Sequence, residues 1–435
     1  MKEIEGGILA AEGYCAASMC VGVKPNATKR DLTMIKSEMP ATVVGVFTRN
    51  KVKAAPVKWD MEVVAHGLAS AVVVNTGIAN AATGKQGLEN CKIEAEAVAE
   101  ALGVSEKEVL VGSTGVIGPQ LPMDKITGGI KELAGKLVSA KDGADVAKAE
   151  AHEAALAIMT TDTQPKEIAV SFEINGVTCK IGAMCKGSGM IHPNMGTMLG
   201  YLLSDLSIDH ELAQKLLRAV VERTFNMVSV DGDTSTNDTV LWLCNGLSGN
   251  EKITAATLGI SLDDIDESGD TDMSTLGNEA YRTLYRALYT VCLYLAKNIA
   301  KDGEGATRLF TAKVIGAPDY ETAKTLAKSV ITSSLTKAAI YGRDANCGRI
   351  FCAMGYSGAE FDPDKVDITM SSKEGSITMI EQGMLPEFSE EEALKILTPD
   401  EITAVCDLHA GSFEAEAWGC DLTHEYVTIN ADYRS

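Results

Sequence analysis

Apolar and polar residues follow two patterns along this chain, one typical of buried strands and one typical of amphipathic helices. Ala41–Arg49 and Ser70–Asn75 are apolar runs too short for helices, so they predict strands. Ile208–Phe225 places Leu212 and Leu216 on one face, which predicts a helix that covers the core. Because the Ser70–Asn75 strand is followed by a glycine-containing loop and a helical pattern, we predict an α/β unit here.

The same criteria divide the rest of the chain into short strands and longer helices. We predict further strands at Glu108–Gly112, Ile168–Ile174, Val177–Ala183, Leu309–Ile315, Ala338–Tyr341, Val366–Met370, Ser376–Ile380 and Val427–Asn430. We predict further helices at Glu89–Leu102, Met123–Leu137, Asp142–Met159, Glu279–Lys301 and Tyr320–Ser333. Ser389, with Glu392 three residues later, predicts the capped start of one more helix.

Length and composition favour a large intracellular α/β protein over a nucleic-acid-binding or membrane protein. The 435 residues exceed one ordinary core, so we expect two closely associated domains or one large layered α/β unit. The formal net charge of −21 argues against nucleic acid or an anionic membrane surface as a partner. Eleven cysteines without a C-x-x-C pair indicate reduced thiols, and no targeting segment or membrane-length apolar run is visible. We therefore expect a soluble, cytoplasmic protein.

The segment Lys186–Leu203 combines a glycine-rich turn with a hydroxyl group at its far end. Pro193 and Gly196 keep the backbone out of regular structure until Thr197, where the apolar pattern predicts a helix. A hydroxyl at a helix start suits a nucleophile, because unpaired N–H groups favour developing negative charge. A helix N-cap threonine is the alternative that this segment alone leaves open.

The string KGSGMIHPNMGTML, Lys186–Leu199, resembles the self-cleavage segment of the ornithine acetyltransferase (glutamate N-acetyltransferase, ArgJ) family, KGSGMI-x-P-x-M-A-T-M-L. The resemblance implies autocatalytic cleavage of the Gly196–Thr197 bond into an alpha chain, 1–196, and a beta chain, 197–435, that begins with the nucleophile Thr197. Gly196 stands where the family usually has alanine, so we expect the speed of cleavage to differ rather than its position.

Further strings resemble the same family in order along nearly the whole chain. They are NTGIANAATG from Asn75, STG from Ser113, TTDT from Thr160, VDGDTSTNDT from Val230, DGEGA from Asp302 and GRDANCGRI from Gly342, the last with Cys347 at the usual tryptophan. From this resemblance, Thr114 and Gly115 would form the oxyanion hole. Thr160, Lys186, Thr197, Glu304, Asn430 and Ser435 would bind substrate.

The resemblance also implies a fold and a reaction. The fold is α/β (α+β layered), an N-terminal-nucleophile-type ArgJ/DmpA-like α-β-β-α sandwich with a second smaller α/β domain. The reaction moves the acetyl group of N2-acetyl-L-ornithine to L-glutamate through an acetyl-threonyl intermediate, which yields ornithine and N-acetylglutamate in arginine biosynthesis. No metal or other cofactor is implied, although the use of acetyl-CoA as a second donor stays open. The cleaved chains are expected to assemble as a heterotetramer of two alpha and two beta chains.

Several alternatives remain at this point. A related N-terminal-nucleophile amidohydrolase or aminopeptidase would pass the acyl group to water, and a silent binding protein would not cleave itself. Asn75 and Asn80 either hydrogen-bond to the backbone of tight turns or bind substrate. Arg343 and Arg349 either bind a substrate carboxylate or form structural bridges within the chain. A calcium loop starting at Asp231 is unfavourable, because the sixth position lacks glycine and the twelfth lacks an acid. We expect instead a network of buried or semi-buried polar groups around the nucleophile.

Overall fold

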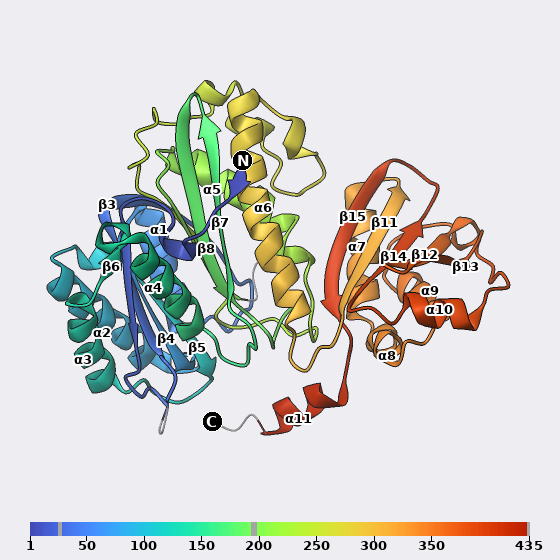
Figure 1. The fold of residues 1–435 in the computed structure, drawn as a ribbon, viewed down its shortest axis with the longest axis horizontal. Helices are drawn as coiled ribbons and strands as arrows, with labels where there is room; N and C mark the ends of the chain where they lie inside the picture. The colour runs from blue at the N-terminus through green and yellow to red at the C-terminus, as the bar shows by residue number, and fades with distance from the viewer. Residues whose placement is uncertain (25–27, 193–197, 433–435) are drawn as a thin grey trace. The chain divides into compact units, whose positions relative to one another are not determined.

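The computed structural model describes residues 1–24, 28–192 and 198–432. The chain divides into two compact units (Figure 1). Unit 1 comprises Met1–Gly187, Asn194–Phe225 and Thr234–Leu295; unit 2 comprises Ser188–Pro193, Asn226–Asp233 and Ala296–Ser435.

Unit 1 is built around one large sheet with strands from most of its length. Its strands are β1 (Lys2–Glu3), β2 (Tyr14–Met19), β3 (Leu32–Phe47), β4 (Leu68–Ile78), β5 (Val109–Val116), β6 (Val138–Ser139), β7 (Lys166–Ile174), β8 (Val177–Lys186), β9 (Leu199–Ser204) and β10 (Thr239–Cys244). They follow the order β1-β7-β8-β9-β10-β3-β2-β6, and β4 pairs with both β3 and β5. The long strand β3 therefore contacts β10, β2 and β4, which curls the sheet into layers.

Alternate side chains of β4 enter two different cores. Val72 and Val74 lie in a core with Tyr201 of β9 and Leu241 of β10, so this core is enclosed between strands. Val73 lies in a second core, shared with helices α2 and α3. A strand that is buried on both faces has a continuous apolar run in its sequence, which explains the SAVVVN pattern.

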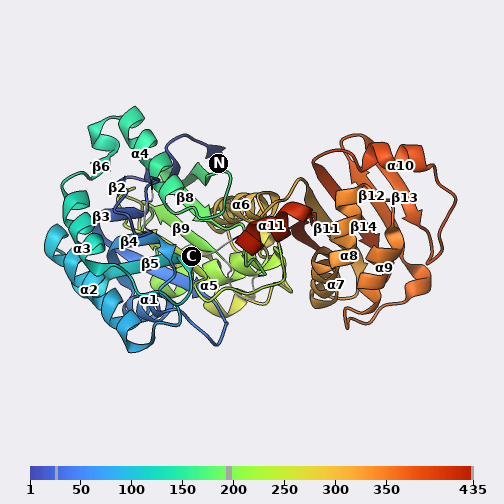
Figure 2. The ribbon, with the colours of Figure 1, turned by 90° about the horizontal axis from the view of Figure 1, so that it is seen from below.

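Helices cover the outer faces of this layered sheet. They are α1 (Ala55–His66), α2 (Gly84–Leu102), α3 (Met123–Ala134), α4 (Ala144–Ala157), α5 (His210–Glu222) and α6 (Glu279–Lys301). The helices α1 and α2 pack on β5, whereas α5 packs on β3 and α6 lies along the β7 and β8 side (Figures 1 and 2). Unit 1 is thus the α/β layered sandwich that was expected. No helix among the described residues is long and apolar enough to cross a membrane.

The helix predicted to begin at Thr197 is wrong, because Leu199–Ser204 forms the strand β9. All six of its residues are buried, and it pairs with β8 on one side and β10 on the other. A short run that is apolar throughout carries no periodicity, so the sequence pattern did not distinguish a central strand from a helix.

Unit 2 contains a five-stranded sheet in the order β13-β12-β14-β11-β15. Its strands are β11 (Leu309–Ala317), β12 (Asp367–Ser372), β13 (Gly375–Ile380), β14 (Glu401–Asp407) and β15 (Phe413–Cys420). Its helices are α7 (Tyr320–Thr332), α8 (Ser334–Gly342), α9 (Cys347–Gly355), α10 (Glu390–Ile396) and α11 (His424–Asp432). As predicted, the Ser389 hydroxyl caps α10 by accepting the Glu392 N–H.

Two predicted strands of unit 2 are helical instead. Ala338–Tyr341 belongs to α8, whose start is capped by the Ser333 side chain. Val427–Asn430 belongs to α11, where the Thr423 hydroxyl accepts the N–H of Tyr426. Val427 is 64% exposed, so the apolar alternation in this segment does not mark a buried strand face.

Candidate active site

Thr114 and Gly115 lie inside the strand β5, not in a turn after it. The predicted strand ended at Gly112, but parallel pairing with β4 continues through Thr76 opposite Thr114 and Gly77 opposite Gly115. Gly115 has φ +130°, and a Cβ atom there would fall 2.3 Å from the carbonyl carbon of Gly77. Only glycine fits this close approach of two backbones.

Lys186 is brought to Thr114 by the fold of unit 1. It ends β8, its side chain is buried, and its Nζ donates a hydrogen bond to Thr114 Oγ1 at 3.3 Å. An ammonium group has no lone pair, so the threonine oxygen must accept. The hydrogen of the Thr114 hydroxyl is therefore left to donate to another group, which is the role that an oxyanion hole requires.

Thr160 is connected to the same region through its backbone. The Thr160 N–H donates to Asp162 Oδ2 at 3.1 Å, and the N–H of Gly187, next to Lys186, donates to Asp162 Oδ1 at 2.7 Å. One carboxylate thus ties the TTDT turn to the start of the glycine-rich loop. The sequence pattern did not single out Asp162 from the threonines around it.

In unit 2, Glu304 and Asn430 form a second contact between predicted site residues. Asn430 Nδ2 donates to Glu304 Oε2 at 2.7 Å, and the Glu304 N–H donates to the Ser188 carbonyl at 2.9 Å. Glu304 is only 8% exposed, and a Cβ on Gly189 would lie 2.3 Å from its carboxyl carbon. The glycine therefore permits the glycine-rich loop to pack directly on the carboxylate.

Asp231 supports this loop from the VDGDTSTNDT string. Its carboxylate accepts the N–H groups of Met190 at 2.6 Å and Ile191 at 2.8 Å, and the Tyr426 hydroxyl at 3.4 Å. Burial raises the pKa of Asp231 above its ordinary value, and its backbone hydrogen bonds only partly oppose this. Sequence reasoning predicted a polar network here, but it did not identify Tyr426 on α11 as a member.

The later part of the same string serves unit 1. Asn237 Nδ2 donates to the carbonyls of Ala79 at 2.6 Å and Ser113 at 2.8 Å, directly before Thr114. Asn237 is buried, so these bonds replace the water that the carbonyls have lost. The string therefore contributes buried polar groups among the described residues, and the arrangement of this network around the nucleophile stays a prediction.

Asn75 and Asn80 also bond to protein groups. Asn75 donates to the Ile78 carbonyl at 3.0 Å and accepts from the Ser113 hydroxyl at 2.6 Å. Asn80 donates to the Gly87 carbonyl at 3.0 Å and has φ +49°, a value that asparagine tolerates better than most residues. These contacts favour the turn-stabilising alternative for both asparagines.

His192 does not have the environment of a general base at neutral pH. Its Nδ1 lies 3.1 Å from the Ser229 hydroxyl oxygen. Burial, and next the positive charge of Lys328, lower the pKa of His192 to about 4. A neutral imidazole held in this way gives no support to a serine-histidine triad.

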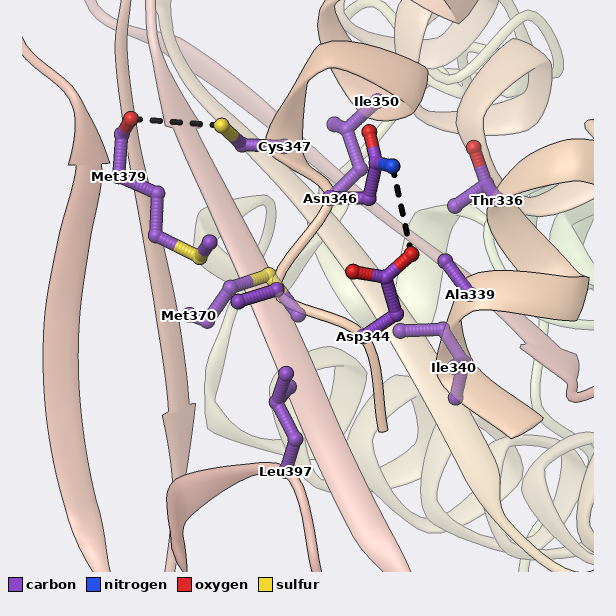
Figure 3. Close-up of a pocket in the computed structure, with 11 residues that line it drawn as sticks. Thr336, Ala339, Ile340, Asp344, Asn346, Cys347, Ile350, Met370, Met379 and Leu397 are labelled. Atoms are coloured by element: carbon purple, nitrogen blue, oxygen red, sulfur yellow. Dashed lines mark hydrogen bonds between the residues drawn. The ribbon is translucent and has the colours of Figure 1, made fainter. Parts of the chain in front are cut away.

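Cys347 lines a small pocket in unit 2 (Figure 3). Its Sγ lies 3.4 Å from the Met379 carbonyl oxygen, and Asn346 Nδ2 donates to Asp344 at 3.3 Å on the same wall. None of the residues that line this pocket was predicted to bind substrate. Cys347, which stands at the family's usual tryptophan, therefore lines a pocket without predicted substrate residues.

Of the two arginines near Cys347, Arg349 holds the chain together locally. Arg349 Nη1 donates to the Leu335 carbonyl at 2.9 Å, and its Nη2 lies 3.9 Å from Asp344 Oδ2. Arg343 ends α8 with the left-handed φ of +54°. The contacts of Arg349 favour the structural bridge over the carboxylate-binding alternative.

Gly196, Thr197 and Ser435 lie outside the described residues, so the predicted cleavage site, the nucleophile and the last substrate contact stay predictions. Within the described part of the chain, Lys186 and Thr114 come together in unit 1, and Glu304 and Asn430 in unit 2. No group of three or more His, Cys, Asp or Glu side chains suited to a metal ion occurs among residues 1–24, 28–192 and 198–432.

Comparison with known proteins identifies the family. Residues 15–435 match the model of the ArgJ family. The chain is 45% identical, over 100% of both chains, to the "arginine biosynthesis bifunctional protein ArgJ" of Symbiobacterium thermophilum. It is 46% identical to a protein of the same name, ArgJ 1, of Clostridium acetobutylicum over 97% of this chain and 96% of that one.

Among solved structures, the chain resembles an ornithine acetyltransferase of Mycobacterium tuberculosis in complex with ornithine. The two are 39% identical with a TM-score of 0.40, over 45% of this chain and 98% of the other. The match to the family model and the full-length identity to its members leave one conclusion: this chain belongs to the ArgJ family.

Proposed function

We propose that this protein is an acetyltransferase that moves the acetyl group of N2-acetyl-L-ornithine to L-glutamate, as a step of arginine biosynthesis. The observation that carries the proposal is the contact between Lys186 Nζ and Thr114 Oγ1, which leaves the threonine hydrogen available to an oxyanion. Family membership and the name of the full-length relatives support the same pathway.

In the proposed mechanism, self-cleavage of the Gly196–Thr197 bond first makes Thr197 the N-terminus of a second chain. Its free α-amine, with an ordinary pKa of about 7.7–8.0, takes the proton of its own hydroxyl. The hydroxyl oxygen attacks the acetyl carbonyl, and Thr114 and Gly115 stabilise the negative charge that forms on the carbonyl oxygen. Collapse expels ornithine, whose amine takes up the proton, and leaves an acetyl-threonyl ester.

Glutamate then completes the reaction. Its α-amine attacks the ester, and Thr197 leaves with a proton, so that N-acetylglutamate forms and the enzyme is restored. The groups proposed to bind the amino acids are Thr160, Lys186, Glu304, Asn430 and Ser435. The Glu304 carboxylate already accepts from Asn430, but its further lone pairs suit a substrate ammonium group.

No metal or organic cofactor has a role in this mechanism, because the nucleophile, the base and the oxyanion donors are all protein groups. Acetyl-CoA is proposed as a second acetyl donor, which would make the enzyme bifunctional, as the names of its relatives state for them. The two chains are proposed to assemble as a heterotetramer of two alpha and two beta chains in the cytoplasm.

An N-terminal-nucleophile hydrolase is the second candidate, since the same threonine ester reacts with water if no amine is bound. The carboxylate and amide of Glu304 and Asn430 favour transfer, because they provide recognition groups for an amino-acid acceptor. A silent binding protein is disfavoured, because Lys186, Thr197 and Glu304 are all present at the positions of the family's motifs.

The deciding experiment assays purified protein with acetylornithine and acetyl-CoA in parallel, with and without glutamate. We expect N-acetylglutamate from both donors, and intact mass spectrometry should show chains 1–196 and 197–435. Release of free acetate at the same rate with and without glutamate would instead identify a hydrolase. A fully active preparation that contains only the uncut chain would refute the mechanism through an N-terminal threonine.

A further inference from the structure

Asp162 is a buried carboxylate at the centre of the predicted substrate contacts of unit 1. Its Oδ1 accepts from Lys166 Nζ and from the Gly187 N–H, each at 2.7 Å, and its Oδ2 accepts the Thr160 N–H at 3.1 Å. The side chain has no exposed surface, and that of Lys166 is only 1% exposed. This carboxylate therefore joins the TTDT turn, the start of β7 and the end of β8.

The charge on Asp162 faces two ammonium groups. Burial raises the pKa of this carboxyl, but the positive charges of Lys166 and Lys186 outweigh that effect and hold the pKa at about 2. Asp162 is therefore ionised at any pH at which the protein works. A buried carboxylate is stable only with such partners, and the loss of one partner leaves the other charge uncompensated.

Lys186 depends on this carboxylate in two ways. The adjacent residue, Gly187, is held by its N–H on Asp162 Oδ1, which fixes the backbone where Lys186 leaves β8. The carboxylate also compensates the charge of the buried Lys186 side chain, which reaches Thr114 Oγ1. Both effects determine where the ammonium group meets the Thr114 hydroxyl.

From this geometry we infer that Asp162 is a positioning residue for acetyl transfer, which holds Lys186 in the place where it orients the Thr114 hydroxyl toward the oxyanion. The inference rests on the proposed function. The competing explanation is that Asp162 only links β7 to β8 through its ion pair with Lys166. The two explanations differ in what the removal of each partner does to the reaction.

The test compares two variants that break the same ion pair. Asp162→Asn keeps the size of the side chain but removes its charge, so kcat should fall by about 10²-fold, the cost of a small misplacement of a catalytic group. KM should change much less than kcat. Lys166→Gln breaks the pair but leaves the Asp162 carboxylate in place beside Lys186 and Gly187. Lys166→Gln should lower the unfolding temperature at least as much as Asp162→Asn does, yet keep kcat within a few-fold of the parental value.

Equal losses of kcat in the two variants, or no loss in Asp162→Asn, would overturn the inference. A double-mutant cycle gives an independent readout: in a Thr114→Val background, Asp162→Asn should cause little further loss, because both changes act on one hydrogen bond. Additive losses would show that Asp162 does not act through Thr114.

If Asp162→Asn does not fold, Asp162→Glu replaces it, since the longer side chain keeps the charge but cannot keep all three contacts in place. A parental kcat in that folded variant would likewise overturn the inference. The parental enzyme separates this inference from the function it rests on. Failure of the parental protein to transfer acetyl groups refutes the proposed function, whereas parental transfer with no effect at Asp162 refutes the positioning role alone.

Discussion

Leu199, the first residue of β9, lies opposite Lys186, the last residue of β8, in an antiparallel ladder. The ladder continues to Ser204 opposite Ile181, and β9 also pairs in parallel with β10. The next strand, β3, pairs with β10 and comes from early in the chain. Strands from before and after the proposed cleavage site therefore lie side by side within one sheet.

This pairing predicts that self-cleavage does not release the two chains. The backbone hydrogen bonds of the β8–β9 and β3–β10 ladders, and the core that contains Tyr201 and Leu241, continue to join them after the bond is cut. Size-exclusion chromatography should elute both chains in one peak, and a denaturing gel should separate them. Separate elution of an active chain under native conditions would contradict the pairing.

The proposed role of Thr197 as the nucleophile gives a second prediction. Thr197→Ala should stay uncut and inactive, because no hydroxyl remains to attack the preceding carbonyl, whereas Thr197→Ser should retain the chemistry for cleavage. Mass spectrometry over time, together with acetyl transfer, checks both variants. Parental transfer by Thr197→Ala would show that another group carries the acetyl.

Thr114→Val should lower kcat by about 10²–10³, the usual loss for one oxyanion donor. Valine matches threonine in shape but cannot accept from Lys186 or donate to the substrate oxygen. Steady-state kinetics with acetylornithine at saturation measures the effect. An unchanged kcat with a raised KM would mean that Thr114 binds substrate but does not stabilise the oxyanion.

Asn430→Ala should raise KM for both amino-acid substrates by about tenfold, since it removes one hydrogen bond to the Glu304 carboxylate. Self-cleavage should be unaffected. Thr428→Ala is the matched control on α11, because its hydroxyl bonds only to the His424 carbonyl among the described contacts. Equal effects of the two variants would point to the stability of α11 and not to substrate binding.

Asp231→Ala should slow self-cleavage by about tenfold or more, because it removes the acceptor of the Met190 and Ile191 N–H groups shortly before the cleavage site in sequence. The fraction of uncut chain is followed by denaturing gel after synthesis. Asp233→Ala serves as the control, since it leaves those two bonds in place. Parental cleavage kinetics in Asp231→Ala would show that the loop does not need this support.

The burial of the Glu94 carboxyl group predicts that the stability of the protein declines with rising pH. Neither of its carboxylate oxygens has a hydrogen-bond partner among the described residues, and burial, followed by the nearby Asp60, raises its pKa to about 8. The unfolded chain binds this proton less tightly, with a pKa of about 4.3. The stability that the proton contributes is present below that pKa and is lost as the pH rises through about 8.

Thermal unfolding should therefore show that the free energy of unfolding of the parental protein falls by up to about 3 kcal/mol between about pH 5.5 and about pH 8. Glu94→Gln, which resembles the protonated form, should lose less over the same interval. Glu96→Gln changes an exposed carboxylate on the same helix and should behave like the parental protein. The same decline of stability with pH in all three proteins would show that Glu94 is not held in its protonated form in the folded protein.

Most helices and strands follow from local pattern alone, because an apolar face at helical spacing, or a short apolar run between turn residues, has one stable way to be buried. The amphipathic helix α5 and the β-branched strand β4 lie where the sequence predicts them. The family motifs in the sequence also identify Lys186, Thr114, Glu304 and Asn430 without any knowledge of the fold.

The tertiary structure decided the rest. It made Leu199–Ser204 a strand, because two neighbouring strands offer it hydrogen bonds on both edges, and it made Asn430 helical, because the Thr423 hydroxyl caps the last helix. It also revealed Asp162, which looks like an ordinary turn residue in the sequence, and the backbone partners of Asp231. The importance of both carboxylates comes from partners that are distant along the chain, and only the folded backbone brings a carboxylate to the N–H groups that it stabilises.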